Sequence, residues 1–366
     1  MKEIIIILLV FTQFLSFGQS NNDVLISFYD KETRLLGFKD SDENVVIEPK
    51  FGFLSVAKIF EKVIAVNEME NGKRKDEYYL LRNGKKFGRD SLYVFDLTYD
   101  CESEGYIRFK DPQSELIGMF DSNGKVTIPA AYNYISQMKN GYFVGLKNAE
   151  KEYFNHEGES DCNHFKWTNG TAYLVNKENE IIIKDFQLSA TETIDWNTAL
   201  VSDTKNNELN RVNFETINGR NISFVDNKKE FELYLDHLSN QLNIEKLMGN
   251  CFDRIIHVDS TGWTSSSKEK FLKTRGSKIV KSILSKDNLN FTYRSSISNF
   301  IPLPKELEYI LDDRKDNCGG LKKGVYPIYA LRISKQDASG KSISQNFQFM
   351  KFDGKIQLIT AILRNE

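Results

Sequence analysis

His257 and Asp259 are the residues of this sequence best suited to acid–base chemistry. They stand at alternate positions of an apolar, strand-like run that begins at Ile255, so both side chains can point to one side of a strand. A carboxylate beside an imidazole can set the tautomer of the ring and prepare it for general acid–base catalysis. The simpler interpretation, which we favour, is that His257 lies at a sheet edge and Asp259 begins a turn at Ser260.

No other catalytic signature is present. The sequence contains no G-x-S-x-G nucleophile elbow, no H-E-x-x-H zinc motif and no Walker-type phosphate loop. Cys162-Asn163-His164, with His156 and Asp161 nearby, supplies metal-ligand residue types without the usual zinc spacing. We interpret these as loop residues and predict neither a metal nor a cofactor.

Four cysteines, Cys101, Cys162, Cys251 and Cys318, are too few for a disulfide scaffold in a chain of 366 residues. No pair is spaced as C-x-x-C, which excludes the usual zinc and thioredoxin-like motifs. An exported protein can still form disulfides. The simplest pairing keeps each bond within one half of the chain, and free buried thiols are an equal alternative.

Basic side chains gather on one predicted helix that ends at Leu284, among them Lys270, Lys273, Lys278 and Lys281. Such a helix can face an anionic membrane surface, a glycan or the acidic first half of the chain, or it can be a solvated polar face. From residue 221 onward 23 Lys and Arg oppose 17 Asp and Glu, whereas the rest of the chain has 26 against 34. The net charge of −2 therefore combines a basic half with an acidic one. No basic motif is interleaved with aromatics, so nucleic acid is not indicated.

The first 18 residues are typical of a cleaved secretory signal. A short charged start precedes the apolar run Ile4–Phe11, and Ser16 and Gly18 provide a small-x-small exit. The apolar run is interrupted at Thr12, well short of the about 20 residues that a membrane span needs. We predict an exported protein, periplasmic or extracellular, with at most peripheral membrane contact.

Composition excludes disordered and collagen-like chains, because 12% of the residues are aromatic. The 26 Phe and 16 Tyr favour β structure, and the length suggests about two domains.

An internal repeat organises the first half. Residues 36–55 align without a gap on residues 117–136, an offset that fits two units of about 40 residues. A degraded copy lies at 78–85, and further copies are indicated at 153–158 and 173–179. Each unit reads as a hairpin that cannot bury its apolar face alone, so neighbouring units must stack.

The clearer copy has Asn123-Gly124 at a tight turn and Pro129 where a strand ends. This pattern resembles the WG-repeat family of bacterial proteins, although Leu36 and Ile117 stand where the family has its Trp. The resemblance implies a β-repeat module that presents a surface, usually without catalysis, and it transfers no active-site residue. The best-matching positions are Gly118, Asp121, Gly124, Lys125, Val126, Ile128, Pro129, Tyr132 and Tyr134.

The second half has a different pattern. Residues 227–230 form a capping-box motif before an amphipathic helical run, and a second capping box begins at Ser266. Strands are predicted at 290–294, 325–334, 345–352 and 355–363, the last two joined by Asp353-Gly354. The end of the sequence resembles the nuclear-transport-factor-like domains, whose curved sheet wraps a pocket.

These patterns predict a mixed fold. We expect an all-β array of stacked or propeller-like hairpins, followed by an α+β domain with helices packed on an antiparallel sheet. The expected boundaries are a signal peptide at 1–18, a β-repeat domain at 20–190, a linker or closing repeat at 191–220 and the α+β domain at 221–366.

The functional expectation is a non-enzymatic binding protein that recognises an unidentified protein or envelope component. The alternative is a small-molecule enzyme with His257 and Asp259 as acid–base pair in a C-terminal pocket. The sequence does not determine the oligomeric state.

Overall fold

The computed structural model describes residues 24–95, 97–154, 165–260, 262–285, 291–297, 309, 311, 314–322, 327–336, 340 and 342–363. The predicted export segment lies outside these residues, and so does Cys162. In the described part of the chain, 51% of the residues lie in strands and 16% in helices.

Short strands joined by turns make up the chain as far as residue 226. They are β1 (Leu25–Tyr29), β2 (Leu36–Lys39), β3 (Val45–Phe51), β4 (Ile59–Phe60), β5 (Val63–Glu70), β6 (Lys73–Leu81), β7 (Lys86–Phe87), β8 (Val94–Phe95), β9 (Thr98–Tyr99), β10 (Ile107–Lys110), β11 (Ile117–Phe120), β12 (Val126–Tyr132), β13 (Tyr134–Ile135), β14 (Tyr142–Lys147), β15 (Glu150–Tyr153), β16 (Phe165–Thr168), β17 (Thr171–Asn176), β18 (Ile181–Lys184), β19 (Ile194–Ser202), β20 (Arg211–Glu215) and β21 (Asn221–Asp226). Two short 3-10 helices, η1 (Arg89–Ser91) and η2 (Leu188–Glu192), interrupt them.

One hairpin turn occurs five times in the described residues as far as residue 226. The N–H of its first residue donates to the carbonyl four positions later, and the N–H of its fourth residue donates back to the first carbonyl. The fourth residue always has a positive φ, between 63° and 84°, which Gly and Asn adopt at little cost. The turns are residues 40–44, 81–85, 121–125, 176–180 and 216–220. Each closes one hairpin, so the array has five units where the sequence showed two clearly.

The first and third units agree in register as well as in sequence. Phe38 pairs with Ile47, and 81 positions later Met119 pairs with Ile128. Each unit also includes the strand before the hairpin, because Phe28 of β1 pairs with Gly37 as Phe109 of β10 pairs with Gly118. A β-carbon on Gly118 would lie 2.7 Å from the Phe109 ring, so this position requires glycine.

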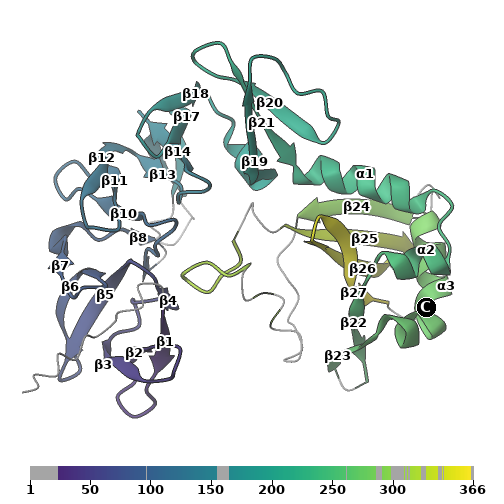
Figure 1. The fold of residues 1–366 in the computed structure, drawn as a ribbon, viewed down its shortest axis with the longest axis horizontal. Coiled ribbons are helices and arrows are strands. Elements are labelled where there is room, and N and C mark those ends of the chain that lie inside the picture. The colour runs from purple at the N-terminus through teal and green to yellow at the C-terminus, as the bar shows by residue number, and fades with distance from the viewer. Residues whose placement is uncertain are drawn as a thin grey trace, which may run out of the picture.

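Neighbouring units share hydrophobic cores. On β6, Tyr78 and Leu80 pack into the core of the first unit, whereas Tyr79 and Leu81 pack with the third. Because alternate side chains of a strand point to opposite faces, one strand serves two cores. β17 does the same between the third and fifth units. Figure 1 shows the units following one another along an arc.

Residues 191–220, expected to be a linker or a closing repeat, contain strands. β19 and β20 flank β21 in a three-stranded sheet, and Trp196 of β19 is buried. β21 leads directly into the first helix: the Asp226 carboxylate accepts the N–H groups of Lys228 and Lys229. The N-cap of this helix is therefore Asp226. The Glu230 side chain of the expected capping box instead accepts hydrogen bonds from residues outside the helix. No linker separates the array from this helix.

The remainder of the chain comprises three helices and one six-stranded sheet. Its elements are α1 (Asn227–Ser239), α2 (Ile244–Gly249), β22 (Cys251–Asp259), β23 (Gly262–Ser267), α3 (Lys268–Leu284), β24 (Phe291–Ile297), β25 (Ile328–Gln336), β26 (Ser342–Phe352) and β27 (Lys355–Ile362). The sheet order is β23-β22-β27-β26-β25-β24, with β22 parallel to β27 and the other pairs antiparallel. It curls into a half-barrel.

The predicted hairpin at Asp353-Gly354 is confirmed, because both residues have the positive φ of a tight turn, 45° and 76°. The helices and the sheet contribute to one hydrophobic core. Its side chains include Phe231 and Leu235 of α1 and Ile279 of α3.

The predicted fold class is wrong. The described chain is mostly β, and its C-terminal part is not a distinct α+β domain. Helical periodicity identified three helices correctly but carried no information on how far the sheet curls. It also gave no sign that the C-terminal part is continuous with β21 and reaches back to the array.

Candidate binding surfaces

The segment Asp100–Glu104 holds neighbouring units together. Glu102 accepts the backbone N–H groups of residues 62–63, both at 2.8 Å, and its burial raises the pKa of the carboxyl group. Two positions later, Glu104 accepts the N–H groups of residues 140–141. The two acceptors bind the beginnings of β5 and β14, so one extended segment fixes two units.

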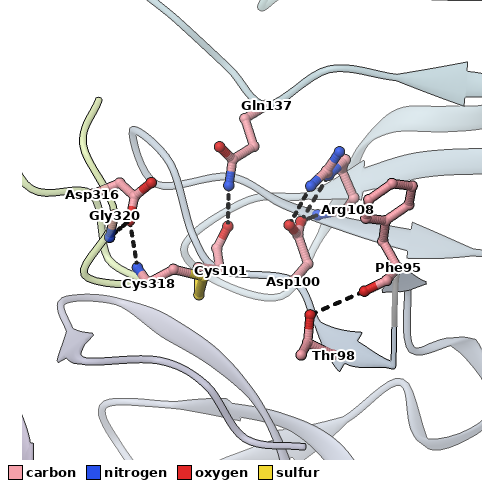
Figure 2. Close-up of a disulfide and its surroundings, with 9 residues drawn as sticks. All are labelled: Phe95, Thr98, Asp100, Cys101, Arg108, Gln137, Asp316, Cys318 and Gly320. Atoms are coloured by element: carbon pink, nitrogen blue, oxygen red, sulfur yellow. Dashed lines mark hydrogen bonds and ion pairs between the residues drawn. A yellow bond between two sulfur atoms is a disulfide. The ribbon is translucent and has the colours of Figure 1, made fainter. Parts of the chain in front are cut away.

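A buried ion pair lies at the start of the same segment. Arg108 Nε is 3.0 Å from Asp100 Oδ2 (Figure 2). Its Nη1 donates to the carbonyl of Ile135 at 3.1 Å. Its guanidinium also lies 4.5 Å from the ring centroid of Tyr93. Burial opposes the charge, yet the Asp100 carboxylate holds the pKa of Arg108 above its ordinary value. The pair leaves Arg108 no freedom to act on a ligand.

Residues 314–322, here called the strap, lie against the first unit of the array. Cys318 forms a disulfide with Cys101, 217 positions away in the sequence (Figure 2). The carbonyl of Asn317 accepts the N–H groups of Lys58 and Ile59, at 2.8 and 3.1 Å. The strap is thus bound to the array by one covalent bond and by main-chain hydrogen bonds.

The other end of the strap is fixed to the half-barrel sheet. Arg314 is buried, donates from Nη2 to the carbonyl of Lys351 at 3.0 Å, and lies over the ring of Phe352. Within the strap, Asp316 accepts the N–H groups of Cys318 and Gly320. The strap therefore connects the two parts of the chain across the gap visible in Figure 1.

The cysteine pairing differs from the simplest one expected. The bond joins the two halves instead of staying within one, because the strap returns to the array. Cys251 is a free buried thiol whose pKa is raised to about 12 by burial. From the sequence, the number of cysteines indicates that disulfides are possible. It does not indicate which of the three possible pairings forms.

A groove of about 440 Å³ opens on the array. Its apolar wall includes Val94 and Leu97 of the β8–β9 hairpin, which are 50% and 78% exposed. Three of its four charged lining residues, all but Asp90, form ion pairs within the array: Arg74 with Glu77 at 3.0 Å, and Arg89 with Asp76. The full lining is Leu54, Arg74, Glu77, Arg89, Asp90, Leu92, Val94, Leu97 and Tyr99.

The structure places His257 and Asp259 in different surroundings. His257 is buried, its Nε2 lies 2.9 Å from Ser266 Oγ, and its ring stacks on Phe271 of α3. Asp259 is exposed at the end of β22. Neither residue lines the array groove or a second groove, which lies between α2 and α3. The imidazole is a packed side chain between β23 and α3.

The packing of His257 predicts acid sensitivity. Burial, with help from Arg275, lowers the pKa of His257 below its usual 6.5, while Asp259 opposes the shift only in part. The unfolded chain binds the proton first, so stability should fall as pH drops below about 6.5 and level off below the folded pKa. Urea denaturation at pH 7.5 and 5.5 should show a smaller pH effect in His257→Gln than in the unaltered protein. An equal pH effect in both proteins would contradict this role.

The four predicted basic residues lie on α3. Lys270, Lys273 and Lys281 are exposed, and Lys278 is half-buried. Lys281 also borders the groove between α2 and α3, which has a volume of about 570 Å³.

No family model matches the chain, and no curated protein matches it. Among solved structures, a putative calcium/calmodulin-dependent protein kinase II association domain from Xanthomonas campestris is similar. It is 12% identical and covers 37% of this chain and 84% of its own, with a TM-score of 0.20. A similarity this weak carries no argument about fold or function.

Among the described residues, no helix combines the length and apolar character needed to cross a membrane. The same residues contain no group of three or more His, Cys, Asp or Glu side chains placed to hold a metal ion. The motif around Cys162 lies outside the described part of the chain.

Proposed function

We propose that this protein is an exported, non-enzymatic binding protein, a divergent relative of the WG-repeat proteins, whose β-repeat array presents the Val94–Leu97 groove to a partner protein. The observation that carries the proposal is an exposed apolar surface in a groove of the array. Large exposed side chains of this kind, rimmed by polar residues, commonly mark protein-binding sites. The disulfide between Cys101 and Cys318 supports export, because disulfides persist in oxidising compartments.

The groove favours an apolar segment of the partner. Arg74, Glu77 and Arg89 are already in ion pairs, so a charged ligand that engages them would have to break those pairs. The hydroxyl of Tyr99 is likewise engaged, donating to Glu77 at 2.7 Å. The wall, in contrast, offers aliphatic side chains such as Leu97, whose burial against a partner is favourable at about 25 cal/mol per Å².

A capture experiment with matched variants tests this function. The full chain without residues 1–18, immobilised and exposed to envelope extract, should retain a partner that Leu97→Asp no longer retains. Leu209→Asp is the control, because Leu209 is equally exposed, at 79%, but does not line the groove. We expect at least a tenfold loss of the captured protein for Leu97→Asp alone. Equal capture by both variants, or equal loss, would refute the groove as the binding site.

A further inference from the structure

A straight row of side chains runs along the exposed face of α3. At 100° per residue, Lys270, Lys273, Ser277, Lys281 and Leu284 fall within one stripe of the helix. All five are exposed, and the opposite face supplies the core. The stripe from Lys270 to Lys281 extends about 16 Å along the helix axis.

The stripe ends in a groove with apolar walls. The groove lies between α2 and α3, which Figure 1 shows at the end of the molecule farthest from the array. Ile244 of α2 and Leu284 of α3 are 40% and 48% exposed there. Its full lining is Leu242, Asn243, Ile244, Ser277, Val280, Lys281, Leu284 and Ser285.

The charge of this stripe is uncompensated within the described residues. Lys270, Lys273 and Lys281 have no carboxylate partner there, whereas some exposed lysines of the array, such as Lys75 and Lys166, form ion pairs. The chain from residue 221 onward also carries a net positive charge. A ligand that meets this face should therefore be anionic.

The shape of the face selects among anionic ligands. A flat bilayer surface cannot fill a groove between two helices, and a small anion cannot span a row of about 16 Å. A protein segment can do both, with apolar side chains in the groove and carboxylates beside the lysines. Amphipathic helices bind apolar grooves in this way, and charge complementarity determines which partners are accepted.

We propose that the α2–α3 face binds an acidic amphipathic segment of a partner protein. Its apolar side chains occupy the groove between Ile244 and Leu284, and its carboxylates lie along Lys270, Lys273 and Lys281. This surface is separate from the array groove, so either site can fail its test without affecting the other.

A charge-swap experiment tests the electrostatic part. Two helix-forming peptides of about 18 residues carry Leu at the i, i+3, i+4 and i+7 positions, one with Glu and one with Lys on the flanks. In fluorescence anisotropy titrations of the chain without residues 1–18, the dissociation constant for the Glu peptide should be about tenfold lower than that for the Lys peptide. The variant K270E/K273E/K281E should reverse that preference. The variant K31E/K85E/K125E makes the same charge change at exposed array positions and should leave binding unchanged.

Further variants and probes test the groove and the choice of partner. Ile244→Asn with Leu284→Asn should weaken Glu-peptide binding roughly tenfold without altering the charge. Unchanged binding in this variant, or equal binding of both peptides, would overturn the proposal. Lysine-dependent sedimentation with phosphatidylglycerol vesicles in the absence of peptide binding would assign the face to lipid instead. A dimer in sedimentation velocity that K270E/K273E/K281E dissolves would assign it to a second copy of the chain.

Discussion

Replacing both bridging cysteines, in C101S/C318S, should lower the free energy of unfolding by about 5 kcal/mol. The bond closes a loop between residues 217 positions apart, and in the chain-entropy account a longer loop restricts the unfolded chain more strongly. It also holds the strap, whose remaining attachments to the array include the two hydrogen bonds to Asn317. Guanidinium denaturation of the oxidised protein and the variant measures the difference.

Reduction provides the matched control for this prediction. A phosphine reductant should destabilise the unaltered protein to the level of C101S/C318S and leave the variant unchanged. If the variant is too unstable to purify, limited proteolysis of the unaltered protein serves instead. Fragments cut between α1 and α3 should then stay joined without reductant and separate with it. Equal stability of oxidised and reduced protein would contradict the role given to the strap.

Arg108→Met should destabilise the array by about 3–5 kcal/mol, because it leaves the buried Asp100 carboxylate without its counter-charge. Asp100 is 7% exposed, and the lost guanidinium also bonds Ile135 of the next strand pair. Thermal and urea denaturation measure the loss.

The double variant Asp100→Asn with Arg108→Met distinguishes charge from packing. Because it removes both charges, it should recover a large part of the stability that Arg108→Met loses. A double variant no more stable than Arg108→Met would show that contacts of the arginine other than the ion pair dominate.

The repeat was predictable where the strand glycine and its neighbours recur. Gly118, Asn123 and Gly124 mark one unit, and 81 positions earlier another keeps Gly37 but has Asp42-Glu43 at the turn. The second, fourth and fifth units have Tyr78, Tyr173 and Asn213 where these two have their strand glycine. The second and fifth units keep the turn sequence, as Asn83-Gly84 and Asn218-Gly219. In the fourth unit Asn179 takes the positive φ of the turn's fourth position.

The candidate surfaces were only partly predictable. The lysines of α3 were identified, since helical periodicity places them on one face, but the groove beside them depends on where α2 packs. The strap could not be predicted, because a contact between Cys101 and Cys318 depends on long-range folding and leaves no local pattern. His257 and Asp259 stand at alternate positions of one strand but differ in exposure: His257 is buried and Asp259 is exposed.

Disulfide mapping tests most directly whether a bond between Cys101 and Cys318 joins the strap to the array. The purified, unreduced protein is alkylated, digested and analysed by mass spectrometry. We predict a linked peptide pair containing Cys101 and Cys318, with Cys251 recovered as a free thiol once the chain is unfolded. A bond from Cys101 to Cys162, or from Cys251 to Cys318, would contradict it, because the strap would then be detached from the array.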